Sequence, residues 1–194
     1  MTDITNIAVI GAGTMGSGIT LTAAMKGIAV CQNDISEDQL DRARAYHAKT
    51  LARSVQKERI SQAEADEIAA RIEYSTALDA ISGAQWVVEA ATENLGLKKE
   101  IFSKMKAACG DDVVLATNTS SISITDIAAS VGDAAPRVIG MHFFNPVPVM
   151  KLVEVIEGLM TSQETPSGPS PSRRRWARRR SRRTIAPVSS PIVC

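Results

Sequence analysis

The N-terminal part of the chain carries the pattern that most limits how it can fold. A β-rich apolar run from Ile4 to Ile10 ends at the loop Gly11-Ala12-Gly13-Thr14-Met15-Gly16. A helix-like segment follows from Met15 to Lys26, and the run Ile28 to Cys31 has the composition of a second strand, with Asp34 just beyond it. This order of strand, glycine-rich turn, helix, strand and acid predicts a βαβ unit.

Each glycine of this loop has a mechanical reason. Gly11 allows the tight turn, Gly13 lets a pyrophosphate approach the backbone, and Gly16 lets helix and strand pack closely. Phosphates would then meet the positive end of the helix. Asp34 follows Gly16 by 18 positions, near the usual spacing for an acid that binds a ribose 2′-hydroxyl and repels a 2′-phosphate.

These features together predict a dinucleotide site that takes NAD in preference to NADP. Its residues are Gly11, Gly13, Thr14, Met15, Gly16 and Asp34. The alternative for the loop alone is a turn that needs glycine only for packing.

The remaining chain alternates strand-like and helix-like segments. The charged stretch from Ser36 to Arg71 predicts two antiparallel helices, the second one capped by Ser61 and Glu64. We expect later helices at Leu95–Cys109 and Ile124–Ser130. The expected strands are Ile72–Tyr74, Trp86–Val88, Val113–Ala116, Arg137–Gly140 and, as the last one, Leu152–Ile156. The alternation predicts an α/β, Rossmann-type, doubly wound and mainly parallel sheet.

Polar residues recur just after these strands. They are Glu89, Glu93, Asn118, Ser120 and His142. Ligands of open α/β sheets gather beyond the carboxyl ends of the strands, so we expect these side chains along one ligand-binding edge.

His142 and Glu154 form the candidate catalytic pair. An imidazole exchanges protons near neutral pH. Glu154 lies twelve positions further on, within the apolar run Leu152–Ile156. Burying a carboxylate there is costly unless a partner such as an imidazole N–H bonds to it. The alternative is a core histidine beside an edge-strand glutamate.

Four segments resemble the NAD-binding domain of the 3-hydroxyacyl-CoA dehydrogenases, and bacterial 3-hydroxybutyryl-CoA dehydrogenases in particular. They are GAGTMGSGI (11–19), VVEAATENLGLKKEIF (87–102), TNTSSISIT (117–125) and GMHFFNPVPVMKLVEVI (140–156). The resemblance runs from about Ile4 to Thr165. It implies NAD-dependent oxidation of a (3S)-3-hydroxyacyl-CoA to a 3-oxoacyl-CoA, in fatty-acid or butanoate metabolism.

The resemblance also assigns roles to individual residues. It makes His142 the catalytic base and Glu154 its partner, with Ser120 and Asn145 binding substrate. Asn118, Glu93 and Lys98 match positions that approach the cofactor. Plain alternatives stay open, since Asn118 to Ser121 can be a capped turn, Asn145-Pro146 a turn, and Lys98 a surface lysine.

The net charge separates two parts of the chain. Residues 1–160 hold 14 basic and 20 acidic residues, a net −6, whereas residues 161–194 hold eight arginines against one glutamate, a net +7. Cys31, Cys109 and Cys194 are widely spaced, which indicates free thiols and a cytoplasmic location, without a metal-ligand motif. No signal peptide or apolar run of about 20 residues is evident, so we expect no membrane partner.

The resemblance stops after Thr165. Residues 1–165 are the predicted NAD-binding domain, and 166–194 are a Pro/Ser/Arg-rich tail that we expect to be disordered. The family would continue into a helical domain that closes over the acyl-CoA and forms a homodimer.

The codons that could encode Thr184 to Cys194 can also be read in a shifted frame that starts at the third base of each codon. Codons allowed for these residues then spell D-S-P-G-F-I-A-N-R-M, which is the segment that the family resemblance leads us to expect at this point. We therefore hypothesise a frameshift near residues 165–166, loss of the helical domain, and impaired activity.

Two other functions are compatible with the sequence. One is a non-catalytic dinucleotide-binding module whose arginine tail binds nucleic acid, although we do not expect nucleic acid to be the principal partner. The other is a 3-hydroxyacid dehydrogenase that acts without CoA. Such enzymes usually use a lysine as the acid–base group, so the His142–Glu154 pair favours the acyl-CoA substrate.

Overall fold

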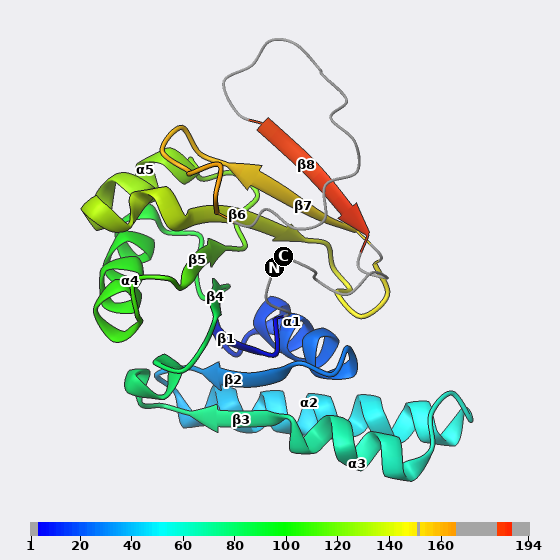
Figure 1. Ribbon diagram of the computed structural model, residues 1–194. Helices are drawn as coiled ribbons and strands as arrows, with labels where there is room; N and C mark the ends of the chain where they lie inside the picture. Colours follow the sequence, from blue (N-terminus) through cyan, green and yellow to red (C-terminus); the bar gives the residue numbers. More distant parts are fainter. Residues whose placement is uncertain (1–3, 151, 166–181, 188–194) are drawn as a thin grey trace.

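Eight strands form one sheet in the computed structural model, which describes residues 4–150, 152–165 and 182–187. The strands are β1 (Asn6–Ile10), β2 (Ala29–Asn33), β3 (Ile72–Ser75), β4 (Trp86–Glu89), β5 (Val114–Thr117), β6 (Val138–Phe143), β7 (Leu152–Glu157) and β8 (Arg182–Pro187). Their order across the sheet is β3-β2-β1-β4-β5-β6-β7-β8 (Figure 1). The first six strands run parallel, and β7 and β8 continue the sheet in antiparallel pairing.

Most of the helices lie between successive strands, as the sequence pattern predicts. They are α1 (Thr14–Met25), α2 (Glu37–Gln56), α3 (Gln62–Ala70), α4 (Leu95–Ala108) and α5 (Ile124–Ala128), with 3₁₀ helices η1 (Leu78–Ile81) and η2 (Ala129–Arg137). Several helices begin at a residue whose side chain accepts a hydrogen bond from an N–H group of the first turn. The predicted capping box of Ser61 and Glu64 is present. Within the described residues, no helix combines the length and apolar character needed to cross a membrane.

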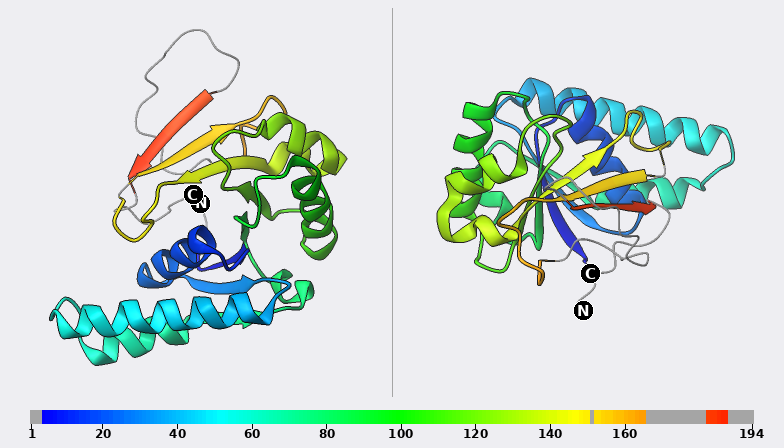
Figure 2. Two further views of the ribbon diagram at one scale, coloured as in Figure 1. Left: turned by 180° about the vertical axis from the view of Figure 1, so that it is seen from behind. Right: turned by 90° about the horizontal axis from the view of Figure 1, so that it is seen from above.

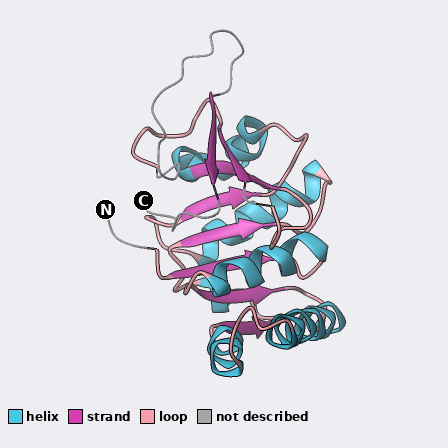
Figure 3. Ribbon diagram, turned by 90° about the vertical axis from the view of Figure 1, so that its right-hand side faces the viewer, coloured by secondary structure: helices cyan, strands magenta, loops and turns pink. Residues whose placement is uncertain are grey.

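Two apolar cores lie on opposite faces of the sheet, and Figure 3 shows the stacked strands with helices beside them. Side chains alternate along each strand, so Val9 enters the core that contains α1 and α3 residues, while its neighbours Ala8 and Ile10 enter the other. That second core contains Phe102 of α4 and Ile127 of α5. Coverage of both faces confirms the predicted doubly wound architecture.

The direction of chain travel reverses between β1 and β4. From β1 the chain moves outward through β2 to β3, and then returns to the other side of β1 with β4. The carboxyl ends of β1 and β4 therefore flank the crevice in which ligands of such sheets bind. The loop that begins at Gly11 follows β1 directly and so lies at this crevice.

The C-terminal part differs from the sequence-based expectation in one place. We predicted that Leu152–Ile156 would be the last strand, but β8 pairs with the far edge of β7 (Figure 2). An edge strand presents unpaired N–H and C=O groups, and an extended segment of almost any sequence can bond to them. The described part of the tail, Arg182–Pro187, is this strand. The other tail residues, 166–181 and 188–194, lie outside the described residues.

Candidate active site

His142 and Glu154 face each other across two antiparallel strands. They are direct register partners in β6 and β7, and His142 Nδ1 lies 3.0 Å from Glu154 Oε2. An ionised carboxylate only accepts hydrogen bonds, so Nδ1 carries a proton and donates a hydrogen bond to Glu154. This arrangement leaves Nε2 of a neutral imidazole as the free proton acceptor.

The pair is partly shielded from water. Each of the two side chains is 21% exposed, and the His142 ring lies beside that of Phe144 with centroids 4.6 Å apart. Met141 and Phe143, which flank His142 in β6, belong to the core on the α1 face. His142 therefore points to the opposite face, on which α5 packs. Its position near the end of β6 places it at the same edge of the sheet as the glycine loop.

Packing within the glycine loop accounts for two of its glycines. Gly11 has a φ of +105°, and a Cβ there would lie 2.8 Å from the carbonyl oxygen of Ala90. A Cβ at Gly16 would lie only 2.0 Å from the carbonyl oxygen of Gly11. Gly13 differs, because it is exposed and no atom lies within 4 Å of the corresponding position. The fold thus requires Gly11 and Gly16, whereas Gly13 leaves open space for a ligand.

The first turn of α1 has the properties of an anion site. Its N-cap is Gly13, which supplies no side-chain hydrogen bond, and the first turn contains no acidic residue. The N–H groups at the start of a helix have no partner within it, and the helix dipole is positive there. Thr14 is exposed at this end, whereas Met15 packs partly against the core. The loop and helix therefore fit the pyrophosphate of a dinucleotide.

Asp34 is tied to the glycine loop itself. Its Oδ2 accepts a hydrogen bond of 2.7 Å from the N–H of Ala12, and its Oδ1 accepts one of 3.0 Å from the N–H of Ser36. An ionised carboxylate has about four acceptor positions, so these two bonds leave room for a ribose hydroxyl. Asp34 thus couples the end of β2 to the turn after β1.

Lys98 is buried, which excludes the alternative that it is a surface lysine. Its Nζ lies 2.6 Å from Glu89 Oε2 and 3.2 Å from Thr117 Oγ1, and both charged side chains are 0% exposed. The ammonium group is therefore enclosed at the carboxyl ends of β4 and β5. The physical reason is the buried carboxylate of Glu89, which needs a cation nearby.

Glu89 and Thr117 were not recognised as the partners of Lys98. A signal was present, because both end strongly apolar strands, Trp86–Glu89 and Val114–Thr117, where a buried polar side chain needs a partner. Glu89 Oε1 also accepts bonds of 2.8 and 3.3 Å from the N–H groups of Ala91 and Thr92. The buried pair therefore shapes the loop after β4, which packs against Gly11.

Asn118 and Glu93 both bond to neighbouring parts of this edge. Asn118 Oδ1 accepts a hydrogen bond of 2.8 Å from the N–H of Phe143, which links the end of β5 to the end of β6. Glu93 is exposed, and its Oε2 accepts a bond of 2.7 Å from the hydroxyl of Thr119. The loops after β4, β5 and β6 are thus joined side by side.

Ser120 and Asn145 are exposed on the loops after β5 and β6. Ser120 also lines a cavity of about 250 Å³ between this loop, the start of α5 and the end of β7. The lining is rich in hydroxyl groups, from Ser120, Ser121, Ser123 and Thr125, and includes Glu157. The structure therefore brings Ser120 to a hollow on the α5 face, while Asn145 lies on the loop that follows His142.

Comparison with known proteins agrees with this geometry. A family model described as "3-hydroxyacyl-CoA dehydrogenase, NAD binding domain" matches residues 6–168. The 3-hydroxybutyryl-CoA dehydrogenase of Clostridioides difficile is 43% identical over 159 residues, which are 82% of this chain and 56% of that protein. The probable 3-hydroxybutyryl-CoA dehydrogenase of Bacillus subtilis is 45% identical over 163 residues, 84% of this chain and 56% of that protein.

Solved structures show the same relationship. The crystal structure of (S)-3-hydroxybutyryl-CoA dehydrogenase PaaH1 from Ralstonia eutropha superposes with a TM-score of 0.80 at 46% identity, covering 82% of this chain and 56% of that one. The chain spans about half the length of the curated relatives it matches. Fold, glycine loop and sequence together show that the chain belongs to the 3-hydroxyacyl-CoA dehydrogenase family, through its NAD-binding domain.

Proposed function

We propose that this chain binds NAD and takes part in the oxidation of the 3-hydroxyl of an acyl-CoA thioester, such as 3-hydroxybutyryl-CoA, to a ketone. The observation that carries the proposal is the 3.0 Å contact between His142 and Glu154. This pair lies at the carboxyl edge of the sheet, where the glycine loop also lies. The names of the relatives support the acyl-CoA substrate class.

The nucleotide would lie across the carboxyl edge of the sheet. Its pyrophosphate would meet Gly13 and the first turn of α1, and Asp34 would accept a bond from the adenosine ribose. A 2′-phosphate beside the Asp34 carboxylate would be repelled, which favours NAD over NADP. Glu93 and Asn118 lie on the loops that would border the nicotinamide half.

Alcohol oxidation removes a hydride and a proton, and NAD supplies the hydride acceptor when it is bound. His142 would take the proton at Nε2 while its Nδ1–H stays bonded to Glu154. The Glu154 carboxylate would fix the imidazole tautomer and stabilise the imidazolium that forms. Ser120 and Asn145 would hold the substrate oxygen and the substrate near the base.

The 194 residues taken alone would work less well than the longer relatives. Much of a closed active site would be contributed by protein beyond the matched region, and water in an open cleft weakens the electrostatic interactions that favour the step. We therefore expect residues 1–165 taken alone to bind NAD with low turnover. A cytoplasmic location and homodimer formation by the full-length protein belong to the same proposal.

Acetoacetyl-CoA-dependent oxidation of NADH tests the function in the reverse direction. The 194-residue chain and a frame-restored chain would be assayed side by side, with His142→Gln and Glu154→Gln introduced into each. Loss of the base should lower kcat by about 10²–10⁴-fold and leave the Kd for NAD unchanged. Glu100→Gln, an exposed change on α4, is the matched control. Wild-type turnover in His142→Gln would refute the assigned chemistry.

The arginine-rich tail favours one other function, a dinucleotide-binding module that also binds nucleic acid. Eight arginines lie between residues 173 and 183, and such a segment binds phosphates by releasing counterions. Salt-sensitive RNA binding that disappears when residues 166–194 are deleted, in a chain without turnover even after frame restoration, would support this function over the first.

A further inference from the structure

A buried histidine lies away from the proposed catalytic pair. His47, in the third turn of α2, is only 2% exposed. Its Nε2 lies 2.9 Å from the carbonyl oxygen of Ser17 in α1, and its Nδ1 lies 2.7 Å from the hydroxyl oxygen of Tyr74 in β3. The imidazole therefore joins three elements that are far apart in the sequence.

The two contacts fix the protonation state of this ring. A backbone carbonyl can only accept hydrogen bonds, so Nε2 must carry a proton and donate a hydrogen bond to the carbonyl oxygen of Ser17. In a neutral imidazole Nδ1 is then an acceptor, and the Tyr74 hydroxyl donates to it. Every polar atom of the ring is satisfied in this one tautomer, which a core position requires.

Ser17 carries the link onward to the glycine loop. Its hydroxyl donates to the carbonyl oxygen of Ala12 at 3.0 Å, and its N–H donates to that of Gly13 at 2.9 Å. The N–H of Ala12 in turn bonds to Asp34. Gln32 completes the support by donating to the carbonyl oxygen of Gly11 at 3.3 Å.

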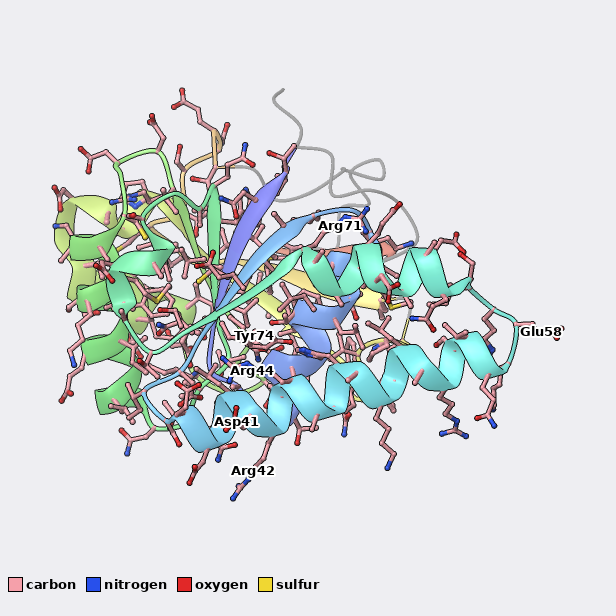
Figure 4. The ribbon with its side chains drawn as sticks, turned by 90° about the horizontal axis from the view of Figure 1, so that it is seen from below. Asp41, Arg42, Arg44, Glu58, Arg71 and Tyr74 are labelled. Carbon is pink, nitrogen blue, oxygen red and sulfur yellow. The ribbon has the colours of Figure 1, made fainter. Side chains whose placement is uncertain are left out.

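Tyr74, the residue of this network farthest from the glycine loop, is also held in place. The Arg44 guanidinium lies over the Tyr74 ring, 4.7 Å from its centroid, and ion pairs with Glu37 and Asp41 fix that guanidinium. Figure 4 shows Arg44 and Tyr74 close together where α2 passes β3, whereas Arg42 extends away from them. Arg42 is exposed and thus offers a matched control on the same helix.

We propose that His47 and Tyr74 are positioning residues that hold the glycine loop and the first turn of α1 in the conformation that accepts the ADP half of the cofactor. This inference rests on the proposed NAD site and adds residues to its support. The geometry that carries it is the continuous path from Tyr74 through His47 and Ser17 to Ala12. His47 touches no ligand; it acts through Ser17.

Acid should weaken this support. Burial lowers the pKa of His47, and the hydrogen bond to the Ser17 carbonyl opposes that effect less strongly. Two titratable side chains lie against the ring, Tyr74 of β3 and Tyr46 of α2, whose ring centroid is 5.6 Å from that of His47. Arg44 lies over Tyr74 and is paired with Glu37 and Asp41, and α1 contributes the uncharged Ser17 carbonyl. A proton on Nδ1 would reverse the bond, so that Nδ1 donates to the Tyr74 hydroxyl oxygen, and it would place a positive charge in this buried site. Ligand affinity should therefore fall as pH drops through the lowered pKa.

The test is the Kd of ADP-ribose, measured by calorimetry between about pH 5 and pH 8. ADP-ribose lacks the nicotinamide, so it tests only the half of the site that the glycine loop and Asp34 would form. At pH 8 the Kd should rise about fivefold in His47→Ile and in Tyr74→Phe, the effect of one hydrogen bond. His47→Gln can keep both bonds without titrating, so it should retain the wild-type Kd and lose the acid-side weakening. Arg42→Ala should match the wild type throughout.

A melting curve for each variant separates binding from folding. If His47→Ile does not fold, Tyr74→Phe, which keeps the ring and loses only the hydroxyl, decides alone. Lower melting temperatures combined with wild-type Kd values and the wild-type pH profile in both variants would overturn the inference, since His47 would then only pack. A wild-type chain that binds no ADP-ribose at any pH would refute the proposed NAD site itself, and the inference with it.

Discussion

Removal of the Lys98 ammonium group tests how the edge of the sheet is held together. The Nζ atom lies 2.6 Å from Glu89 Oε2, and neither side chain has any exposed surface. In Lys98→Met the apolar stem is replaced by one of similar length, but the Glu89 carboxylate remains buried. Its remaining partners are the hydroxyl of Thr117 and the N–H groups of Ala91 and Thr92.

The expected magnitude follows from the uncompensated charge. Breaking a buried ion pair by removing one partner costs about 3–5 kcal/mol, a large part of the roughly 5–15 kcal/mol that stabilises a domain. The cost arises from the stranded carboxylate and not from a strong net attraction. The double variant Lys98→Met/Glu89→Gln should therefore regain most of the lost free energy of unfolding, because the amide oxygen of Gln can still accept the bonds of the loop.

Urea unfolding followed by tryptophan fluorescence measures these free energies. Lys104→Met, on an exposed position of the same helix, is the control and should lie within about 0.5 kcal/mol of the wild type. Equal destabilisation of the single and double variants would refute the reasoning, and so would a Lys98→Met chain as stable as Lys104→Met.

Three further outcomes follow from particular contacts. Gly16→Ala should abolish NAD binding measured by calorimetry, because its Cβ would lie 2.0 Å from the Gly11 carbonyl oxygen; unchanged affinity would contradict the described loop. Thr20→Val should raise the free energy of unfolding by about 1 kcal/mol, since the Thr20 hydroxyl is buried without a described partner. Thr22→Val, which loses a bond to the Gly18 carbonyl, should give no such gain. Burial raises the pKa of the Cys31 thiol to about 11, so its alkylation by iodoacetamide should be slow at pH 7.5 and accelerate as pH rises toward that value; rapid alkylation of the folded chain at neutral pH would contradict the burial.

Much of the fold could be predicted because local patterns and packing agree. The run Ile4–Ile10, the glycine loop and the following helix correspond to β1 and α1, with ends shifted by one or two residues. The capping box at Ser61 marks the start of α3 because its bonds are local. The strand at Arg182–Pro187 could not be predicted, because pairing with an edge depends on what the rest of the fold leaves open.

The candidate site could also be predicted only in part from the sequence. His142 and Glu154 could be paired from sequence because a carboxylate in the apolar run Leu152–Ile156 needs a partner. We predicted that His142 would lie just after a strand, whereas it lies within β6, directly opposite Glu154. The partner of Lys98 could not be found by spacing, since Glu89 and Thr117 come from two different strands. The His47–Tyr74 contact could not be predicted either, because the two residues are 27 positions apart and only the tertiary fold brings α2 and β3 together.

A crystal structure with NAD and acetoacetyl-CoA bound tests the central claim most directly. The quantity to measure is the distance from His142 Nε2 to the 3-oxygen of the substrate. The account predicts a hydrogen bond of about 3 Å, with Nδ1 still bonded to Glu154 and the pyrophosphate at the first turn of α1. A His142 side chain out of reach of that oxygen, or a nucleotide bound away from the glycine loop, would contradict it.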